Sequence, residues 1–120
     1  MNLLNLEDEK FKTVKIKGYN FKIRAMFPKD KIMVAQRRMG LQNGNPVEAL
    51  TSGDFNFFEN IAIIDVCVEE MPKELKANES CVNWIDQELI NQLAEEIKAH
   101  TLFIEGELKK NKPLDGGEKG

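Results

Sequence analysis

The order of apolar and polar residues predicts two strands near the start of this chain. Between residues 11 and 25, apolar side chains alternate with basic ones on both sides of the segment Gly18-Tyr19-Asn20. A period of two is typical of a strand with one buried face, and glycine and asparagine between two such runs favour a turn. We therefore predict a hairpin with an apolar face of Val14, Ile16, Phe21 and Ile23, and a basic face of Lys15, Lys17, Lys22 and Arg24.

The spacing becomes helical after the hairpin. An isolated hairpin is marginal in water, so we expect helices to cover its apolar face. Pro28 suits a first helical turn, and Gly40 is placed to end the helix in the left-handed conformation. Asn45 followed by Pro46 predicts a short turn. Between the two ends of the helix, helical spacing is seen in Ile32, Ala35, Arg38 and Met39.

Residues 55–71 predict a central helix. Their apolar side chains cover most of the helix circumference, which is typical of a helix that other elements surround. Pro72 ends it, because the residue before a proline is driven away from helical geometry. Asp65 interrupts the apolar surface and would be costly to bury without a partner. We expect a lysine or arginine from residues 29–38 to pair with it.

The last helix follows a polar connector over residues 72–84, in which Trp84 is expected to cover the core. Asp86 is placed as the N-cap, and Ile85 and Ile90 are placed to form a hydrophobic staple. Residues 111–120 lack any apolar period, which predicts a flexible tail. One apolar stripe runs along the helix through Ile90, Leu93, Ile97, Thr101, Ile104 and Leu108.

These elements predict an α+β fold: an N-terminal β-hairpin packed on a mostly helical body of three to four helices. A chain of 120 residues is near the commonest domain size, so we expect one domain over residues 1–110. The longest apolar stretch is too short for a membrane span, and the first residues lack the pattern of a signal peptide. We therefore expect a soluble protein of a cytoplasm, with Cys67 reduced and structural.

Charge is unevenly distributed along the chain. Residues 1–40 hold ten lysines or arginines against four acids, whereas residues 41–120 hold seven against sixteen. Such asymmetry is compatible with attraction between the two halves of one chain or with head-to-tail self-association.

The chain offers few groups for catalysis. Its one histidine, His100, lies within the stripe of the last helix, where we expect a hydrogen-bonded residue at the edge of the core. No cluster of metal-ligand type and no phosphate-cradling loop is present in the sequence. The sequence therefore predicts a protein that is not an enzyme and needs no metal or cofactor.

Two groups of residues are candidates for contact with a partner. The first is the basic hairpin face, which could be solvated surface that protects an edge strand, a protein contact or a nucleic-acid contact. Nucleic acid is the least favoured of the three, because no aromatic residues interleave the cations and the chain is acidic overall. The second is Leu102 with Phe103, placed opposite and beside the buried stripe, which suggests self-association.

The order of elements resembles that of phage tail assembly chaperones. The resemblance rests on the basic, alternating hairpin Val14 to Arg24 and on the helix start Pro28-Lys29-Asp30. It implies a non-catalytic protein that binds the tape measure protein, recruits major tail subunits, often oligomerises and is absent from the finished particle. Two alternatives stay open: a structural virion protein of the connector or tail-completion type, and a small nucleic-acid-binding regulator that uses the hairpin cations.

Overall fold

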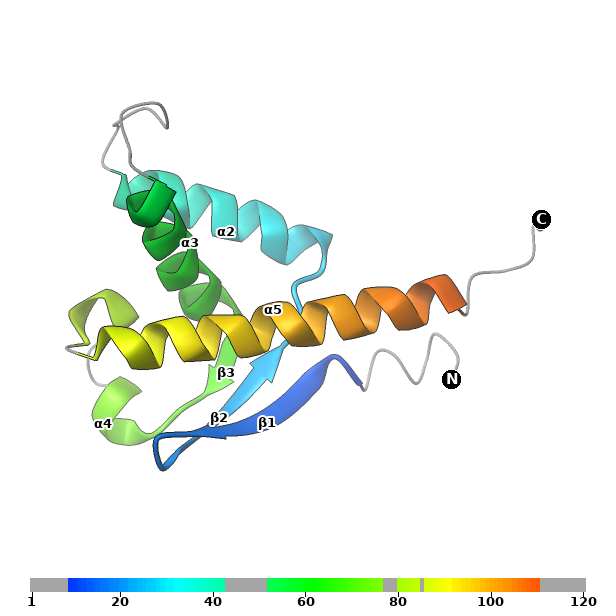
Figure 1. The fold of residues 1–120 in the computed structure, drawn as a ribbon, viewed down its shortest axis with the longest axis horizontal. Helices are drawn as coiled ribbons and strands as arrows, with labels where there is room; N and C mark the ends of the chain where they lie inside the picture. The colour runs from blue at the N-terminus through cyan, green and yellow to red at the C-terminus, as the bar shows by residue number, and fades with distance from the viewer. Residues whose placement is uncertain (1–8, 43–51, 77–79, 85, 111–120) are drawn as a thin grey trace.

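The computed structural model describes residues 9–42, 52–76, 80–84 and 86–110, and it confirms the α+β fold (Figure 1). The predicted turn at Asn45, the staple residue Ile85 and the tail over 111–120 lie outside the described residues. The elements in chain order are strands β1 (Phe11–Ile16) and β2 (Tyr19–Arg24), helices α2 (Pro28–Leu41) and α3 (Ser52–Cys67), strand β3 (Val68–Glu70), the short helix α4 (Lys73–Lys76), the 3-10 turn η2 (Cys81–Asn83) and helix α5 (Gln87–Lys110).

The hairpin forms with the predicted apolar face but with a different turn. Strands β1 and β2 pair antiparallel, with Val14 opposite Phe21 and Ile16 opposite Tyr19. The two residues between the strands are Lys17 and Gly18, with φ angles of 52° and 85°. Positive φ at both positions is typical of the type I′ turn, whose twist matches that of the strands. Lys17 therefore belongs to the turn rather than to the basic face, because the turn begins one residue earlier than expected.

The sheet has a third strand that the sequence pattern did not predict. The helix expected over residues 55–71 ends at Cys67, and Val68–Glu70 pair antiparallel with β2. Pro72 directly restricts only Met71, so the physical reason for the earlier end is the pairing of Val68–Glu70 with β2. A short extended segment there also satisfies backbone groups of β2 that would otherwise form a free edge. The strand order is β1-β2-β3.

Helix α2 runs further than expected and buries a different face. Gly40 lies inside the helix, which ends at Leu41 with Gln42 as a right-handed cap. The prediction of a left-handed Gly40 was wrong, because the Gln42 N–H closes the last turn on the carbonyl of Arg38 instead. Asp30 and Val34 face the interior, while Ile32 and Met39, which had supplied the helical spacing, are exposed.

The core lies between the sheet and the long helix α5, which crosses the sheet as Figure 1 shows. Helix α3 packs against both α2 and α5, and its residues 61–64 are fully buried, as expected for a surrounded helix. The stripe of α5 is buried as far as Ile104, whereas Leu108 is partly exposed. Trp84 covers the core as expected, and its indole N–H donates to the carbonyl of Leu75.

Asp65 joins three elements of the helical body. Its carboxylate accepts hydrogen bonds from Arg37 Nε at 3.0 Å, Ser80 Oγ at 2.7 Å and Cys81 N at 3.2 Å. Arg37 is thus the cation that was expected from residues 29–38. The network connects α2, α3 and η2, and it provides the partners that a carboxylate on a largely apolar helix requires.

Asp65→Ala should destabilise the protein by about 2–3 kcal/mol, because it leaves a guanidinium, a hydroxyl and a backbone N–H without their shared acceptor. Urea unfolding followed by circular dichroism measures this difference. Glu74→Ala removes an exposed carboxylate from α4 and is the matched control, with an expected change within about 0.5 kcal/mol. Equal effects of the two variants would contradict the structural role of Asp65.

Candidate protein-binding surfaces

Cations of the hairpin are largely engaged by acids from later in the chain. Lys17 Nζ lies 2.9 Å from Asp86 and 2.8 Å from Glu88, at the start of α5. These contacts raise the pKa of Lys17, through Glu88 first and Asp86 second, and hydrogen bonds from Lys17 and then from the Leu89 N–H lower the pKa of Asp86. The attraction between the two oppositely charged halves is therefore intramolecular.

Arg24 carries the most buried of these ion pairs. Its guanidinium donates to Asp30 Oδ1 at 2.8 Å and also to the Glu69 carboxylate. Asp30 accepts a second hydrogen bond from the N–H of Phe27, just before α2. Burial by itself would raise the pKa of Asp30, but the Arg24 guanidinium and the Phe27 N–H outweigh it and hold that pKa below its usual range. Arg24 thus connects β2 with α2 and β3.

Lys22 and Lys15 retain more freedom. Lys22 Nζ lies 4.0 Å from Glu70 and 4.9 Å from the centre of the Phe11 ring. Lys15 is exposed and has no ion pair among the residues that the structure describes. Of the four cations predicted to form one contact surface, Lys15, Lys22 and Arg24 share the outer sheet face and Lys17 lies in the turn.

Leu102 and Phe103 are both exposed but lie on different sides of α5. Leu102 is 69% and Phe103 49% exposed. Phe103 stacks on His100 and lines a shallow hollow with Phe11 at the start of β1. Leu102 shares another side of α5 with Glu105, which pairs with Lys31 of α2. Neighbours in a helix point about 100° apart, so the two side chains leave α5 in different directions.

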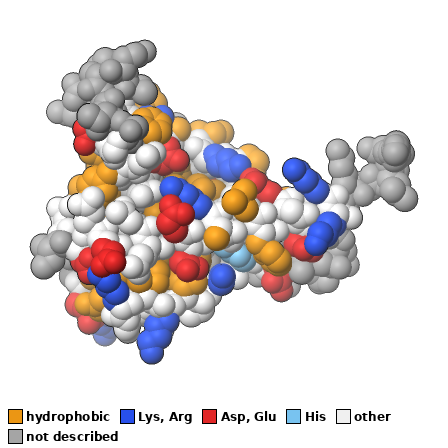
Figure 2. Space-filling view, in the orientation of Figure 1, with side chains coloured by type: hydrophobic (Ala, Val, Ile, Leu, Met, Phe, Trp, Pro, Cys, Tyr) orange, Lys and Arg blue, Asp and Glu red, His pale blue; other side chains and the backbone are white. Residues whose placement is uncertain are grey.

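His100 has the structural role that its position predicted. It is 7% exposed, and its Nε2 lies 2.9 Å from the carbonyl of Glu9 and 3.1 Å from that of Lys10. Carbonyl oxygens only accept, so Nε2 carries the hydrogen and donates to them. The histidine attaches the start of β1 to α5. Figure 2 shows apolar side chains at the surface around this single histidine.

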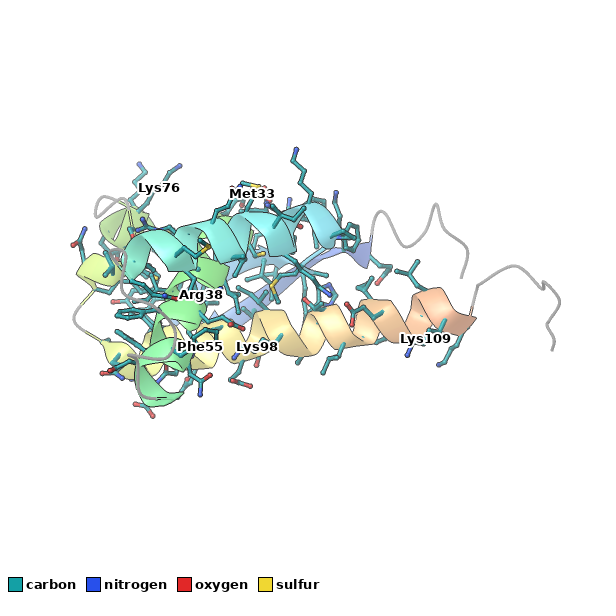
Figure 3. The ribbon with its side chains drawn as sticks, turned by 90° about the horizontal axis from the view of Figure 1, so that it is seen from above. Met33, Arg38, Phe55, Lys76, Lys98 and Lys109 are labelled. Carbon is teal, nitrogen blue, oxygen red and sulfur yellow. The ribbon has the colours of Figure 1, made fainter. Side chains whose placement is uncertain are left out.

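An exposed apolar surface on α2 was missed at the level of sequence. Ile32 is 61%, Met39 59% and Met33 40% exposed. Ile32 and Met39 are seven residues apart and therefore lie on one face of the helix. Met33 lies on the side of α2 turned away from α5 (Figure 3). We call Ile32, Met33 and Met39 the α2 stripe. The sequence places apolar residues on two faces of α2, and only one of these faces can be buried. This pattern could have predicted that the other face is exposed.

A cation–π contact joins the C-terminal part of α2 to α3. The Arg38 guanidinium lies 4.7 Å from the centre of the Phe55 ring in α3, and the two side chains meet between the helices in Figure 3. Arg38 also donates to Gln42. Both basic residues near the end of α2, Arg37 and Arg38, are thus engaged within the protein.

Thiols and metal-ligand groups contribute nothing to these surfaces. Cys67 and Cys81 are free and buried, and burial raises the pKa of Cys67 to about 12. Cys81 lies in the polar connector, and its thiol is buried and donates to the carbonyl of Ile61. Within the described ranges, no three histidine, cysteine or acidic side chains come together as a metal site, and no helix has the length and apolarity of a membrane span.

Comparison of the chain with protein-family models, with curated proteins and with solved structures found no match.

Stability should depend on pH through Asp30. Its pKa is lower in the folded state than the unfolded value of about 3.9, so its contribution is complete above that value and is lost as the pH falls through the folded pKa. Asp30→Asn should therefore cost about 1–2 kcal/mol at pH 7, and this difference should shrink below about pH 4. Unfolding in urea at several pH values measures the difference.

Glu74→Gln, a change of an exposed acid, is the control for this series. Its stability should follow that of the unaltered protein at every pH. A difference between Asp30→Asn and the unaltered protein that stays constant from pH 7 down to pH 2 would refute the role of the Asp30 charge.

Proposed function

We propose that this protein is an assembly chaperone of the phage tail type, which binds a helical segment of a tape measure protein and recruits major tail subunits to it. It acts in the cytoplasm of the host cell through protein–protein contact, without catalysis, metal or cofactor. The observation that carries the proposal is the α2 stripe, which exposes three large apolar side chains on one helix.

The shape and chemistry of the α2 stripe favour a helical partner. A helix exposes a continuous ridge of side chains, and ridges of this kind pack into the grooves of a second helix. Two of the three residues are methionines, whose flexible thioethers adapt to irregular partner surfaces. Exposed apolar side chains gathered on one element mark interaction sites more often than single ones do.

The positive charge next to the α2 stripe favours a partner helix that carries acidic residues. Lys29 is exposed, lies one turn before Ile32 and Met33, and has no ion pair among the described residues. Lys31, by contrast, is neutralised by Glu105. An amphipathic helix with acidic residues beside its apolar stripe complements this surface. Covering such helices of a long tail protein until tail subunits replace the chaperone would prevent their aggregation.

The two alternatives differ in what they require of the surface. A nucleic-acid-binding regulator needs cations that are free to contact phosphates, whereas Lys17, Lys22 and Arg24 are paired with acids of the same chain. A structural virion component could use the α2 stripe equally well. It would be found in purified particles, and an assembly chaperone would not.

Replacing the α2 stripe should abolish partner binding. We expect the double variant Ile32→Glu/Met39→Glu to weaken binding to a fluorescent helical peptide from a tape measure protein by at least about tenfold, because both buried apolar contacts are lost and acids face acids. Fluorescence anisotropy measures the dissociation constant. Both residues are exposed in the free protein, so its thermal stability should change little.

Val82→Glu is the matched control for that experiment. Val82 is also an exposed apolar residue, at 45%, but it lies in η2. Its replacement should leave the affinity unchanged. If the unaltered protein does not bind such peptides at micromolar concentration, or if Val82→Glu weakens binding as much as the double variant does, the proposal fails.

A further inference from the structure

The two edges of the sheet differ in a way that bears on partner binding. Strand β3 at one edge has three residues, of which Glu69 and Glu70 are acidic, and Pro72 follows soon after. Its pairing with β2 is also irregular between Lys22 and Ile23. Short length, charge, proline and irregular pairing are the devices by which natural sheets prevent edge-to-edge association. The β3 edge is therefore protected.

Strand β1 at the other edge has none of these interruptions. It has six residues without proline or glycine, and its pairing with β2 is regular over its whole length. Figure 1 shows β1 along the margin of the sheet away from β3. Lysines are its only protective feature, and the side chain of Lys15 stands on the outer face of the sheet rather than across the edge.

The register identifies the backbone groups that β1 presents at this edge. The Ala25 N–H donates to the carbonyl of Lys10, so 10 and 25 are a hydrogen-bonded pair, and such pairs then alternate along an antiparallel ladder. Even-numbered residues of β1 therefore bond to β2. The N–H and C=O groups of Phe11, Thr13 and Lys15 point outward, and no described residue bonds to them.

We infer that β1 pairs antiparallel with β1 of a second copy, so that two three-stranded sheets become one continuous sheet. The twofold axis passes beside Thr13, which faces Thr13 of the other copy, and Phe11 faces Lys15. In this register every outward N–H and C=O group of Phe11, Thr13 and Lys15 obtains a partner. The interface uses β1 and is independent of the α2 stripe, so either proposal can fail without the other.

Side-chain chemistry favours this register over its neighbours. Paired threonines are favourable across strands. Each Lys15 faces the Phe11 ring of the other copy, and Phe11 already attracts a lysine within one chain, since Lys22 Nζ lies 4.9 Å from the centre of its ring. A shift by two residues in one direction would oppose Lys12 to Lys12, and in the other direction it would leave Phe11 without a partner. A shift by one residue would break the match of donors and acceptors.

Exposed apolar residues next to the β1 edge also favour a second copy of the chain as the partner. Phe11 and Phe103 line one hollow between β1 and α5 together with Lys12, Ala99 and His100. A strand added to β1 would lie along this hollow and cover part of both rings. This gives Phe103 a role in self-association, whereas Leu102, on a different side of α5, has none in this interface.

The decisive variant is Thr13→Pro, which removes an outward N–H and leaves the ladder to β2 intact. Sedimentation equilibrium of the unaltered chain should give twice its mass of 13.7 kDa at high concentration. Thr13→Pro should raise the dissociation constant at least about tenfold, since each dimer loses both central hydrogen bonds. Thr13→Val keeps the N–H and should change it little.

A crosslinking pair tests the register itself and does not depend on the folding of the proline variant. Thr13→Cys places two thiols directly opposite each other, so a short bifunctional thiosulfonate reagent should join the copies. Lys15→Cys places its thiols about 13 Å apart along the strands, beyond that reagent. The native thiols are buried and should not react.

A monomer at millimolar concentration, a dimer that Thr13→Pro leaves unchanged, or crosslinking at position 15 instead of 13 would each overturn the inference.

Discussion

A two-stranded hairpin is marginally stable in water, and the burial of one of its faces is the constraint on which the other elements of this protein depend. Val14, Ile16, Phe21 and Ile23 are all buried against the interior. Covering that face requires the long, one-sided stripe of α5, and α5 in turn leaves space for α3. The position of α2 follows, because it packs on α3 and begins directly after β2.

Ion pairs then attach the hairpin to the helices at points where the apolar contacts end. Lys17 connects the turn with the start of α5, and Arg24 connects the end of β2 with α2 and β3. Several cations of the positive first third are thus paired with acids of the later chain within one molecule. Among the described residues, the apolar surface on α2 and the backbone groups on the outer edge of β1 are available to partners, which is why both proposals concern contact with protein.

Sequence reasoning succeeded where one physical effect dominated. The alternation of the hairpin, the stripe and N-cap of α5, the cation for Asp65 and the covering position of Trp84 all follow from burial or charge pairing alone. It failed where two effects competed. The apolar residues before Pro72 are compatible with either a helix or a strand. Pairing with the free edge of β2, which is a tertiary contact, makes Val68–Glu70 a strand.

Candidate surfaces were harder to predict than the elements. Two apolar faces of α2 have the same helical spacing, and only packing against α3 decides that Val34 is inside and Ile32 outside. The hairpin cations form a clear pattern in sequence, yet the acidic partners of three of them lie 45 or more residues away, beyond any local signal. The angle around the helix placed Leu102 opposite the buried stripe, and the structure has this side chain 69% exposed.

The Asp65 network has a consequence for motion. One carboxylate holds segments that the chain separates by 28 and 15 residues, so α2, the middle of α3 and η2 share the same acceptor. Separating any one of them exposes a charge whose other partners are then incompletely bonded. We expect these three segments to open as one cooperative unit, and Trp84, which directly follows η2, to be released from the core in the same event.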